Sequence, residues 1–259
     1  MYKRLVSFTL ILVFLICSLG QAYASSYDVS LLDNKIIEVE SSQYGSDMRI
    51  MVEKGNDKYY YSLNSPKEEI PVQLGDGPYL VKILKKIEGN KYKVVEKSNL
   101  NIKNSSIDVF LSSSQPVYWD GIKSVTELAN ELTKQSKSDK EKVEVVYQYI
   151  IENIKYDNNK INTISTDYVP DLDKVLKDKN GICYDYAALF AGLLRSQGIY
   201  TKLIKGYKND MKEYHAWNEV LLDGKWVIID TTYDAALSKG NKNLSMIKSI
   251  NEYNKLREY

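Results

Sequence analysis

The spacing of apolar residues changes near Ser112, and this change constrains the fold more than any other feature of the chain. From Tyr27 to Ser112, short apolar and aromatic runs alternate with turn residues, and no helical period of useful length appears. The runs lie at 35–40, 48–54, 58–63, 79–87 and 91–96. We therefore expect a small all-β domain at 27–112, sandwich-like and immunoglobulin-like in the loose sense.

Turn residues separate several of these runs and mark the end of the β region. Gly55-Asn56-Asp57 and Gly89-Asn90 each stand between two runs, as hairpin connections do. The stretch from Ser112 to Gly121 includes Pro116 and is typical of a linker or entry loop. We place a second domain after the β region, at 113–259.

Helical patterns begin after the linker. Ser124 with Glu127 and Ser138 with Glu141 have the spacing of a capping box, in which hydroxyl and carboxylate bind free amides of the first turn. Apolar residues follow the second pair at helical spacing: Val143, Val146, Tyr147, Ile150 and Ile154. In the last stretch, 235–259, apolar residues in a polar setting predict a further helix that lies over a hairpin.

The first 24 residues have the pattern of a signal peptide. Lys3 and Arg4 precede an apolar run at 5–19, and Ala22-Tyr23-Ala24 is a small-x-small cleavage pattern. The run is shorter than the roughly 20 residues that span a bilayer, so we expect cleavage before Ser25 and no stable membrane insertion afterwards. A retained anchor is the alternative. The mature protein would be secreted, and extracellular or cell-wall associated.

The charge balance argues against one class of partner. The chain has 35 basic and 34 acidic residues, and the predicted signal peptide contains two of the basic ones, which leaves a mature net charge of about −1. Lysines and glutamates are interspersed along the chain. Nucleic-acid binding requires a concentrated basic face, so we expect no nucleic-acid partner.

Removal of the predicted signal peptide leaves one cysteine, Cys183, and one histidine, His215. Exported proteins usually contain cysteines in pairs, because disulfides persist outside the cytosol. A single cysteine cannot form an internal disulfide, so Cys183 is either an inert buried thiol or a reactive one. Its neighbours in the sequence favour a reactive thiol.

Cys183 stands at the predicted start of a helix. Asn180-Gly181 is a turn signal, the residues from Cys183 onward have an apolar helical pattern, and Gly198 ends it. At a helix N-terminus the dipole and the free amides favour a thiolate. The main-chain N–H of Cys183 would also donate to the oxyanion that forms when the sulfur attacks a carbonyl.

His215 and Asp230 lie on two strands joined by a predicted tight turn. Asp223-Gly224 is a strong signal for a two-residue hairpin, and its register places Trp217 opposite Asp230. His215 is then the diagonal neighbour of Asp230 on the same face, within side-chain reach. A carboxylate there can orient the imidazole and leave one ring nitrogen for the thiol.

Other residues near these positions offer alternatives. Glu219 shares the predicted face and is the second candidate for an orienting acid, whereas Asp185 falls on another helix face and is expected to be solvated. Trp217 and Trp226 share the predicted face and either exclude water or belong to the core. The chain has no close-spaced pair of zinc ligands, so we expect neither a metal nor another cofactor.

Three segments resemble the sequence blocks of the transglutaminase-like superfamily of papain-like cysteine enzymes. They are NGICYDYAALFAGLLRSQGI, YHAWNEVLLDGKW and IIDTTYD, with the pair Tyr156-Asp157 as an upstream element. The resemblance covers about 126–234 and implies an α+β fold, with a Cys-bearing helix packed on an antiparallel sheet. It also implies Cys183 as nucleophile, His215 as base and Asp230 as orienting acid.

The resemblance further implies a thiol acyltransferase or hydrolase that acts on a protein or peptide, including cell-wall peptide. A thioester formed by Cys183 with a glutamine carboxamide or a peptide carbonyl would pass its acyl group to an amine or to water. The alternatives are a cysteine peptidase or amidase acting on protein or cell-wall peptide, and a non-catalytic cell-surface interaction module.

Overall fold

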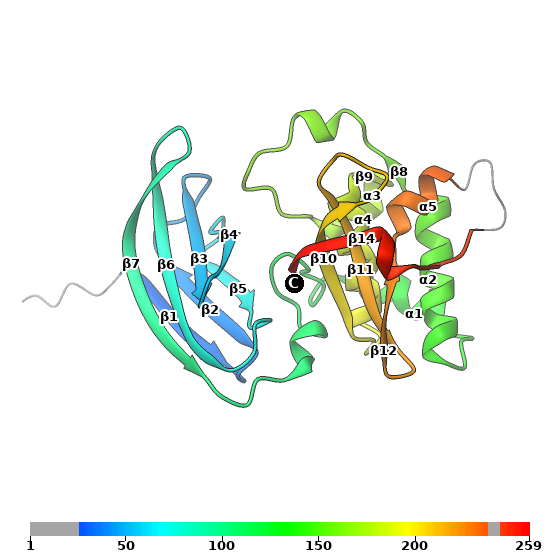
Figure 1. Cartoon of the computed structure of the whole chain (residues 1–259), viewed down its shortest axis with the longest axis horizontal. Helices are drawn as coiled ribbons and strands as arrows, with labels where there is room; N and C mark the ends of the chain where they lie inside the picture. The colour runs from blue at the N-terminus through cyan, green and yellow to red at the C-terminus, as the bar shows by residue number, and fades with distance from the viewer. Residues whose placement is uncertain (1–25, 238–243) are drawn as a thin grey trace, which may run out of the picture.

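The computed structural model describes residues 26–237 and 244–259, and the predicted signal peptide lies outside the described residues. Strands occupy the first part of the described chain, and helices with a second sheet form the rest (Figure 1). The end of the chain lies between these two parts (Figure 1). Among the described helices, none is long and apolar enough to cross a membrane.

Two antiparallel sheets form the first part, which we call the β-sandwich. Their strand orders are β1-β2-β5 and β4-β3-β6-β7. The strands are β1 (Tyr27–Leu32), β2 (Ile36–Ser41), β3 (Met48–Lys54), β4 (Asp57–Ser62), β5 (Lys67–Pro71), β6 (Gly77–Glu88) and β7 (Lys91–Ile102). Ile37 of one sheet and Ile50 and Ile83 of the other belong to one buried cluster, so the core lies between the two sheets.

The predicted strands and hairpins of the β-sandwich are confirmed. The five predicted runs correspond to β2, β3, β4, β6 and β7. Gly55-Asn56 connects β3 to β4, and Gly89-Asn90 connects β6 to β7. Gly55 and Gly89 have φ values of 59° and 50°, which glycine adopts without a steric penalty. The sequence analysis missed β1 and β5.

The second part contains a five-stranded antiparallel sheet in the order β13-β12-β11-β10-β14. Its strands are β10 (Thr201–Lys208), β11 (His215–Leu222), β12 (Lys225–Ile229), β13 (Ile247–Lys248) and β14 (Tyr253–Glu258). The helices are α1 (Lys123–Thr133), α2 (Asp139–Asn153), α3 (Leu172–Asp178), α4 (Cys183–Arg195) and α5 (Thr231–Leu237). Two short parallel strands, β8 (Lys155–Tyr156) and β9 (Asn180–Gly181), precede α4.

Helix α4 lies at the centre of this part, because apolar residues surround it on almost every side. Its side chains share a core with α1, α2, α3 and with the face of the sheet that carries Leu203, Ala216 and Val220. Gly192 allows close packing, since a Cβ there would lie 2.6 Å from a methyl carbon of Leu172. The predicted α+β arrangement, with the Cys-bearing helix on an antiparallel sheet, is therefore confirmed.

Two local predictions have different outcomes. Ser138 caps α2 by accepting from the N–H of Glu141, as predicted. Ser124 does not cap α1, because the helix begins at Lys123 and the Ser124 hydroxyl donates instead to Asp173 at 2.6 Å. The helix expected within 235–259 is largely wrong, since only the end of α5 is helical and the described residues after 243 form β13, a short 3₁₀ turn and β14.

The β-sandwich and the second part contact each other through polar and aromatic groups. The Tyr259 ring packs edge-on against Tyr59 and Tyr61, with centroid separations of 5.4 and 5.9 Å. Gln115, in the predicted linker, accepts from the main-chain N–H of Ser62 at 2.7 Å and donates to Glu68 at 2.8 Å. These contacts hold the β-sandwich close to α4 and its sheet.

Candidate active site

The hairpin between β11 and β12 has the predicted register. Asp223 and Gly224 have φ values of 51° and 74°, as a two-residue turn of type I′ requires. Asn218 pairs with Ile229, so Asp230 follows directly at the end of β12. His215 begins β11, and the hairpin thus brings the histidine and the aspartate to the same end of the sheet.

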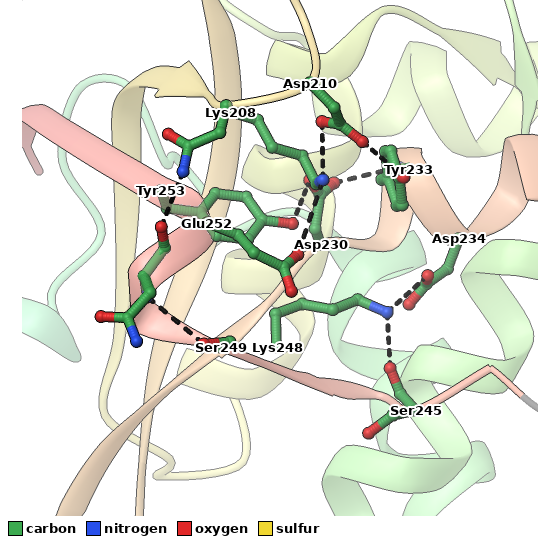
Figure 2. Close-up of polar contacts among 12 residues, drawn as sticks. Lys208, Asp210, Asp230, Tyr233, Asp234, Ser245, Lys248, Ser249, Glu252 and Tyr253 are labelled. Carbon is green, nitrogen blue, oxygen red and sulfur yellow. Dashed lines mark hydrogen bonds and ion pairs between the residues drawn. The ribbon is translucent and has the colours of Figure 1, made fainter.

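His215 and Asp230 form a buried pair. His215 Nε2 lies 2.8 Å from Asp230 Oδ2, and the side chains are 3% and 0% exposed. Asp230 also accepts from the hydroxyl of Tyr253 at 3.0 Å and from the main-chain N–H of Tyr233 at 3.0 Å (Figure 2). Three donors therefore compensate for the burial of the carboxylate and fix its orientation.

Cys183 is the first residue of α4 and faces a cleft that His215 also lines. Burial opposes protonation of His215, but the hydrogen bonds to Asp230 and Cys183, with the negative charges of both groups, raise the pKa of His215 to about 10. The imidazole is therefore protonated at neutral pH. The Cys183 sulfur thus stands at the N-terminus of α4, beside this imidazole.

The packing around Gly181 explains why a glycine stands two residues before Cys183. A Cβ at Gly181 would lie 2.6 Å from the Cβ of Asp185, so only glycine allows the chain to pass this close to the helix. Asp185 is fully buried, contrary to the expectation that it is solvated. Its carboxylate accepts from the main-chain N–H of Ile182 at 2.8 Å, the position before Cys183.

Asp185 also binds a loop that forms one wall of the cleft. Its carboxylate accepts from Lys160 Nζ at 2.7 Å and from the hydroxyl of Tyr168. We call residues 157–171 the cleft loop, because several of its side chains line the cleft. The sequence analysis missed this role, and the available signal was an acidic residue at the third position of a helix that starts without a side-chain cap.

The β-sandwich binds the cleft loop from its other side. Ser62 donates its hydroxyl to the carbonyl of Asp167 at 2.8 Å. Arg49 lies 3.4 Å from the Thr166 hydroxyl and 3.9 Å from the Asp167 carboxylate. The loop is therefore fixed between α4 and β3–β4.

The remaining candidate residues occupy defined positions. Trp217 packs beside His215, with ring centroids 6.3 Å apart, and against Tyr253. Trp226 instead packs against Phe110. Glu219 forms an ion pair with Lys255 at 3.0 Å, so the structure gives His215 an acidic partner in Asp230 and not in Glu219.

The described residues include no group of three His, Cys, Asp or Glu side chains placed to hold a metal ion. The cleft has a volume of about 300 Å³. Its lining combines Cys183 and His215 with apolar side chains, hydroxyls and one lysine. A thiol, an imidazolium and a buried carboxylate in this order can form and break a thioester.

A family model and two curated relatives match part of the chain. Residues 126–231 match the family model described as the transglutaminase-like superfamily. This part of the chain therefore resembles that superfamily, and the match covers less than half of the chain. The match spans α1 to the start of α5 and includes Cys183, His215 and Asp230.

Two curated relatives of this transglutaminase-like chain are kyphoscoliosis peptidases. The mouse protein is 28% identical over 136 residues, which are 49% of this chain and 20% of that protein. The human protein is 25% identical over 150 residues, or 53% of this chain and 22% of that protein. The chain thus spans about a fifth of the length of the curated relatives it matches.

Among solved structures, the periplasmic domain of TgpA from Pseudomonas aeruginosa is similar to this transglutaminase-like chain. The alignment has a TM-score of 0.40 and 17% sequence identity, and it covers 79% of this chain and 74% of that one.

Proposed function

We propose that this protein is a secreted thiol acyltransferase or hydrolase in which Cys183, His215 and Asp230 carry the reaction. The observation that supports the proposal most is the 2.8 Å contact between His215 and the buried Asp230, next to a cysteine at the start of α4. An inert structural cysteine has no need of an imidazolium held by a buried carboxylate.

The first half of the reaction forms a thioester. The Cys183 thiolate attacks a glutamine carboxamide or a peptide carbonyl, and the main-chain N–H of Cys183 donates to the oxyanion. The sulfur–carbon bond forms, the carbon–nitrogen bond breaks, and His215 gives its proton to the departing ammonia or amine. Asp230 holds the ring in the orientation that this transfer requires.

The second half releases the acyl group. An amine or a water molecule attacks the thioester carbon, His215 takes the proton of the attacking group, and the thiolate leaves. An amine acceptor gives transglutamination, and water gives deamidation or peptide cleavage. The curated relatives are named peptidases, which supports water as one acceptor.

The chemistry can be tested by mass spectrometry. A glutamine-rich protein is incubated with the chain and a labelled primary amine, alongside a Cys183→Ala control. Addition of the amine at glutamine, conversion of glutamine to glutamate, or new chain ends would each support the proposal and name the reaction. Identical products with the wild type and the control would contradict it for this class of substrate.

The secreted location is a separate part of the proposal. It rests on the charged start, the apolar run and the cleavage pattern of residues 1–24. We expect the exported chain to begin at Ser25, and N-terminal sequencing of the protein from culture medium or cell wall would check this. A product that retains Met1 in the membrane fraction would contradict it.

A further inference from the structure

The cleft of Cys183 contains one charged side chain that the proposed reaction does not use. It is lined by Ile161, Ile164, Ser165, Thr166, Tyr168, Ile182, Cys183, Tyr184, Lys205, Tyr214, His215 and Ala216. Within this lining, Lys205 is the lysine, and no aspartate or glutamate of the described residues accompanies it. We propose that Lys205 binds a carboxylate of the acyl donor, beside the bond that Cys183 attacks.

This inference rests on the proposed function, because it names a feature of the substrate for the same site. Lys205 lies on β10 opposite Ala216, and the next residue, Gly206, pairs with His215. Its Nζ lies 3.4 Å from the centroid of the Tyr184 ring, and Tyr184 directly follows Cys183. A group bound to Lys205 would therefore lie close to both the sulfur and the imidazole.

The other little-exposed lysines of the second part show what is unusual about Lys205. Each of them has a carboxylate partner: Lys160 binds Asp185, Lys202 binds Glu258, Lys208 binds Asp210, and Lys248 binds Asp234. Two of these ion pairs are visible in Figure 2. Within the described residues, the ammonium of Lys205 lies over the rings of Tyr184 and Tyr259.

The surroundings of Lys205 make it a strong binder of an anion. Burial lowers the pKa of Lys205 to about 8, against the opposing effect of Cys183, so the ammonium is still the main form at pH 7. Aromatic rings compensate only part of the cost of removing this cation from water. A carboxylate in the cleft would supply the remaining compensation, and in a protein or peptide it comes from an acidic side chain or from a chain end.

Lys205 has a competing role that must be distinguished. A cation near Cys183 also stabilises the thiolate, whatever the substrate. A larger fraction of thiolate speeds the reaction of the Cys183 sulfur with every alkylating reagent. A binding site for a carboxylate, in contrast, speeds only the reagents that carry one, so two alkylating reagents of nearly equal size separate the two roles.

The test compares iodoacetate, which carries a carboxylate, with iodoacetamide, which is neutral. Rates of modification at Cys183 are measured at pH 7 in a Cys17→Ser background. We expect Lys205→Met to lower the ratio of the iodoacetate rate to the iodoacetamide rate about fivefold, the size of a single charge effect at close range. Lys205→Arg should keep the wild-type ratio.

Lys202→Met is the matched control, because Lys202 lies on the same strand but outside the lining of the cleft. It should leave the ratio unchanged. An unchanged ratio in Lys205→Met, or an equal fall of both rates, would overturn the inference. Slow iodoacetamide labelling of the wild type would count against the proposed function instead, and the ratio can still be measured in that case.

A second arm identifies the source of the carboxylate. Three glutamine peptides are used as protectants against iodoacetamide: a neutral acetylated amide, the same amide with an internal glutamate, and a neutral acetylated peptide with a free C-terminal carboxylate. We expect at least one acidic peptide to protect the wild type more than the neutral amide does, and to lose this advantage in Lys205→Met. Equal protection by all three would contradict the inference.

Discussion

The β-sandwich and the transglutaminase-like part bury charge in different ways. The sandwich has an apolar and aromatic core, and its buried charged residues, Arg49 and Glu68, bind groups outside the sandwich. The second part buries Asp185, Asp230 and Asp234 with 0% exposure each. The first part is therefore stabilised mainly by apolar burial, whereas the second contains charged side chains in its interior, where the desolvation penalty is largest.

Each buried aspartate of the second part has specific donors. Asp234 accepts from the Tyr147 hydroxyl at 2.8 Å. It also accepts from Lys248 at 2.6 Å (Figure 2). Burial nevertheless raises the pKa of Asp234, against the lowering effect of these partners. A buried charge costs several kcal/mol without such partners. Asp185 binds two side chains of the cleft loop, and Asp230 binds His215.

The comparison predicts that loss of the nucleophile lowers activity without lowering stability. Cys183→Ala should lower turnover at least about 10³-fold, because it removes the nucleophile, while changing the unfolding free energy by about 1 kcal/mol or less. Steady-state assays on a substrate found by mass spectrometry, with urea denaturation of the same samples, check both values. Residual activity above a tenth of the wild-type activity would contradict the role of Cys183 as nucleophile.

A buried aspartate should matter for stability as well. Asp185→Asn leaves Lys160 without its carboxylate, and we expect it to lower the unfolding free energy by about 3 to 5 kcal/mol. Asp178→Asn is the matched control, since its ion pair with Lys174 is exposed and should contribute little to stability. Chemical denaturation of both variants would show equal losses if the burial of Asp185 were unimportant.

Substitutions in the core of the β-sandwich should lower the stability of the chain and leave the reactivity of Cys183 unchanged. Ile50→Ala removes buried apolar volume from the shared core of the two sheets and should cost about 3 kcal/mol, whereas Ile50→Val should cost about 1 kcal/mol. The iodoacetamide rate of Cys183 should stay within about twofold of the wild type at concentrations of urea where the chain is folded. A large change in that rate would show that the core of the sandwich also controls the site.

The pH dependence of stability should report the protonation of His215. Its pKa is raised from 6.5 to about 10, so its stabilising contribution is complete below pH 6.5 and is lost as pH rises towards 10. The unfolding free energy of the wild type should therefore fall more steeply over this range than that of His215→Gln. Denaturant titrations at pH 6.5, 8 and 9.5 measure the two slopes, and equal slopes would contradict the assignment.

The pairing of His215 with Asp230 could be predicted from the sequence because one local signal determines it. The two-residue turn at Asp223-Gly224 fixes the register of β11 and β12, and the register fixes which side chains share a face. The start of α4 at Cys183 was equally local, since a turn signal and an apolar helical pattern meet there.

The features that the sequence analysis missed depend on distant partners. Asp185 is buried by Lys160 and Tyr168, which a helical pattern around Cys183 does not reveal. Strand β14 forms because it adds an edge to β10, about fifty residues earlier in the chain, and its short apolar pattern alone fits a helix equally well. The β5 strand carries three charged residues, which hide the alternation of Glu68 and Ile70 towards the interior.

The rate of Cys183 modification by iodoacetamide at pH 6 tests the central claim most directly. It is measured by intact mass in a Cys17→Ser background, next to the same background with His215→Gln and to glutathione as a free thiol. An active thiolate–imidazolium pair predicts that the wild-type site reacts at least about tenfold faster than glutathione, and that His215→Gln removes the advantage. A wild-type rate at or below that of glutathione, unchanged in the variant, would contradict the account.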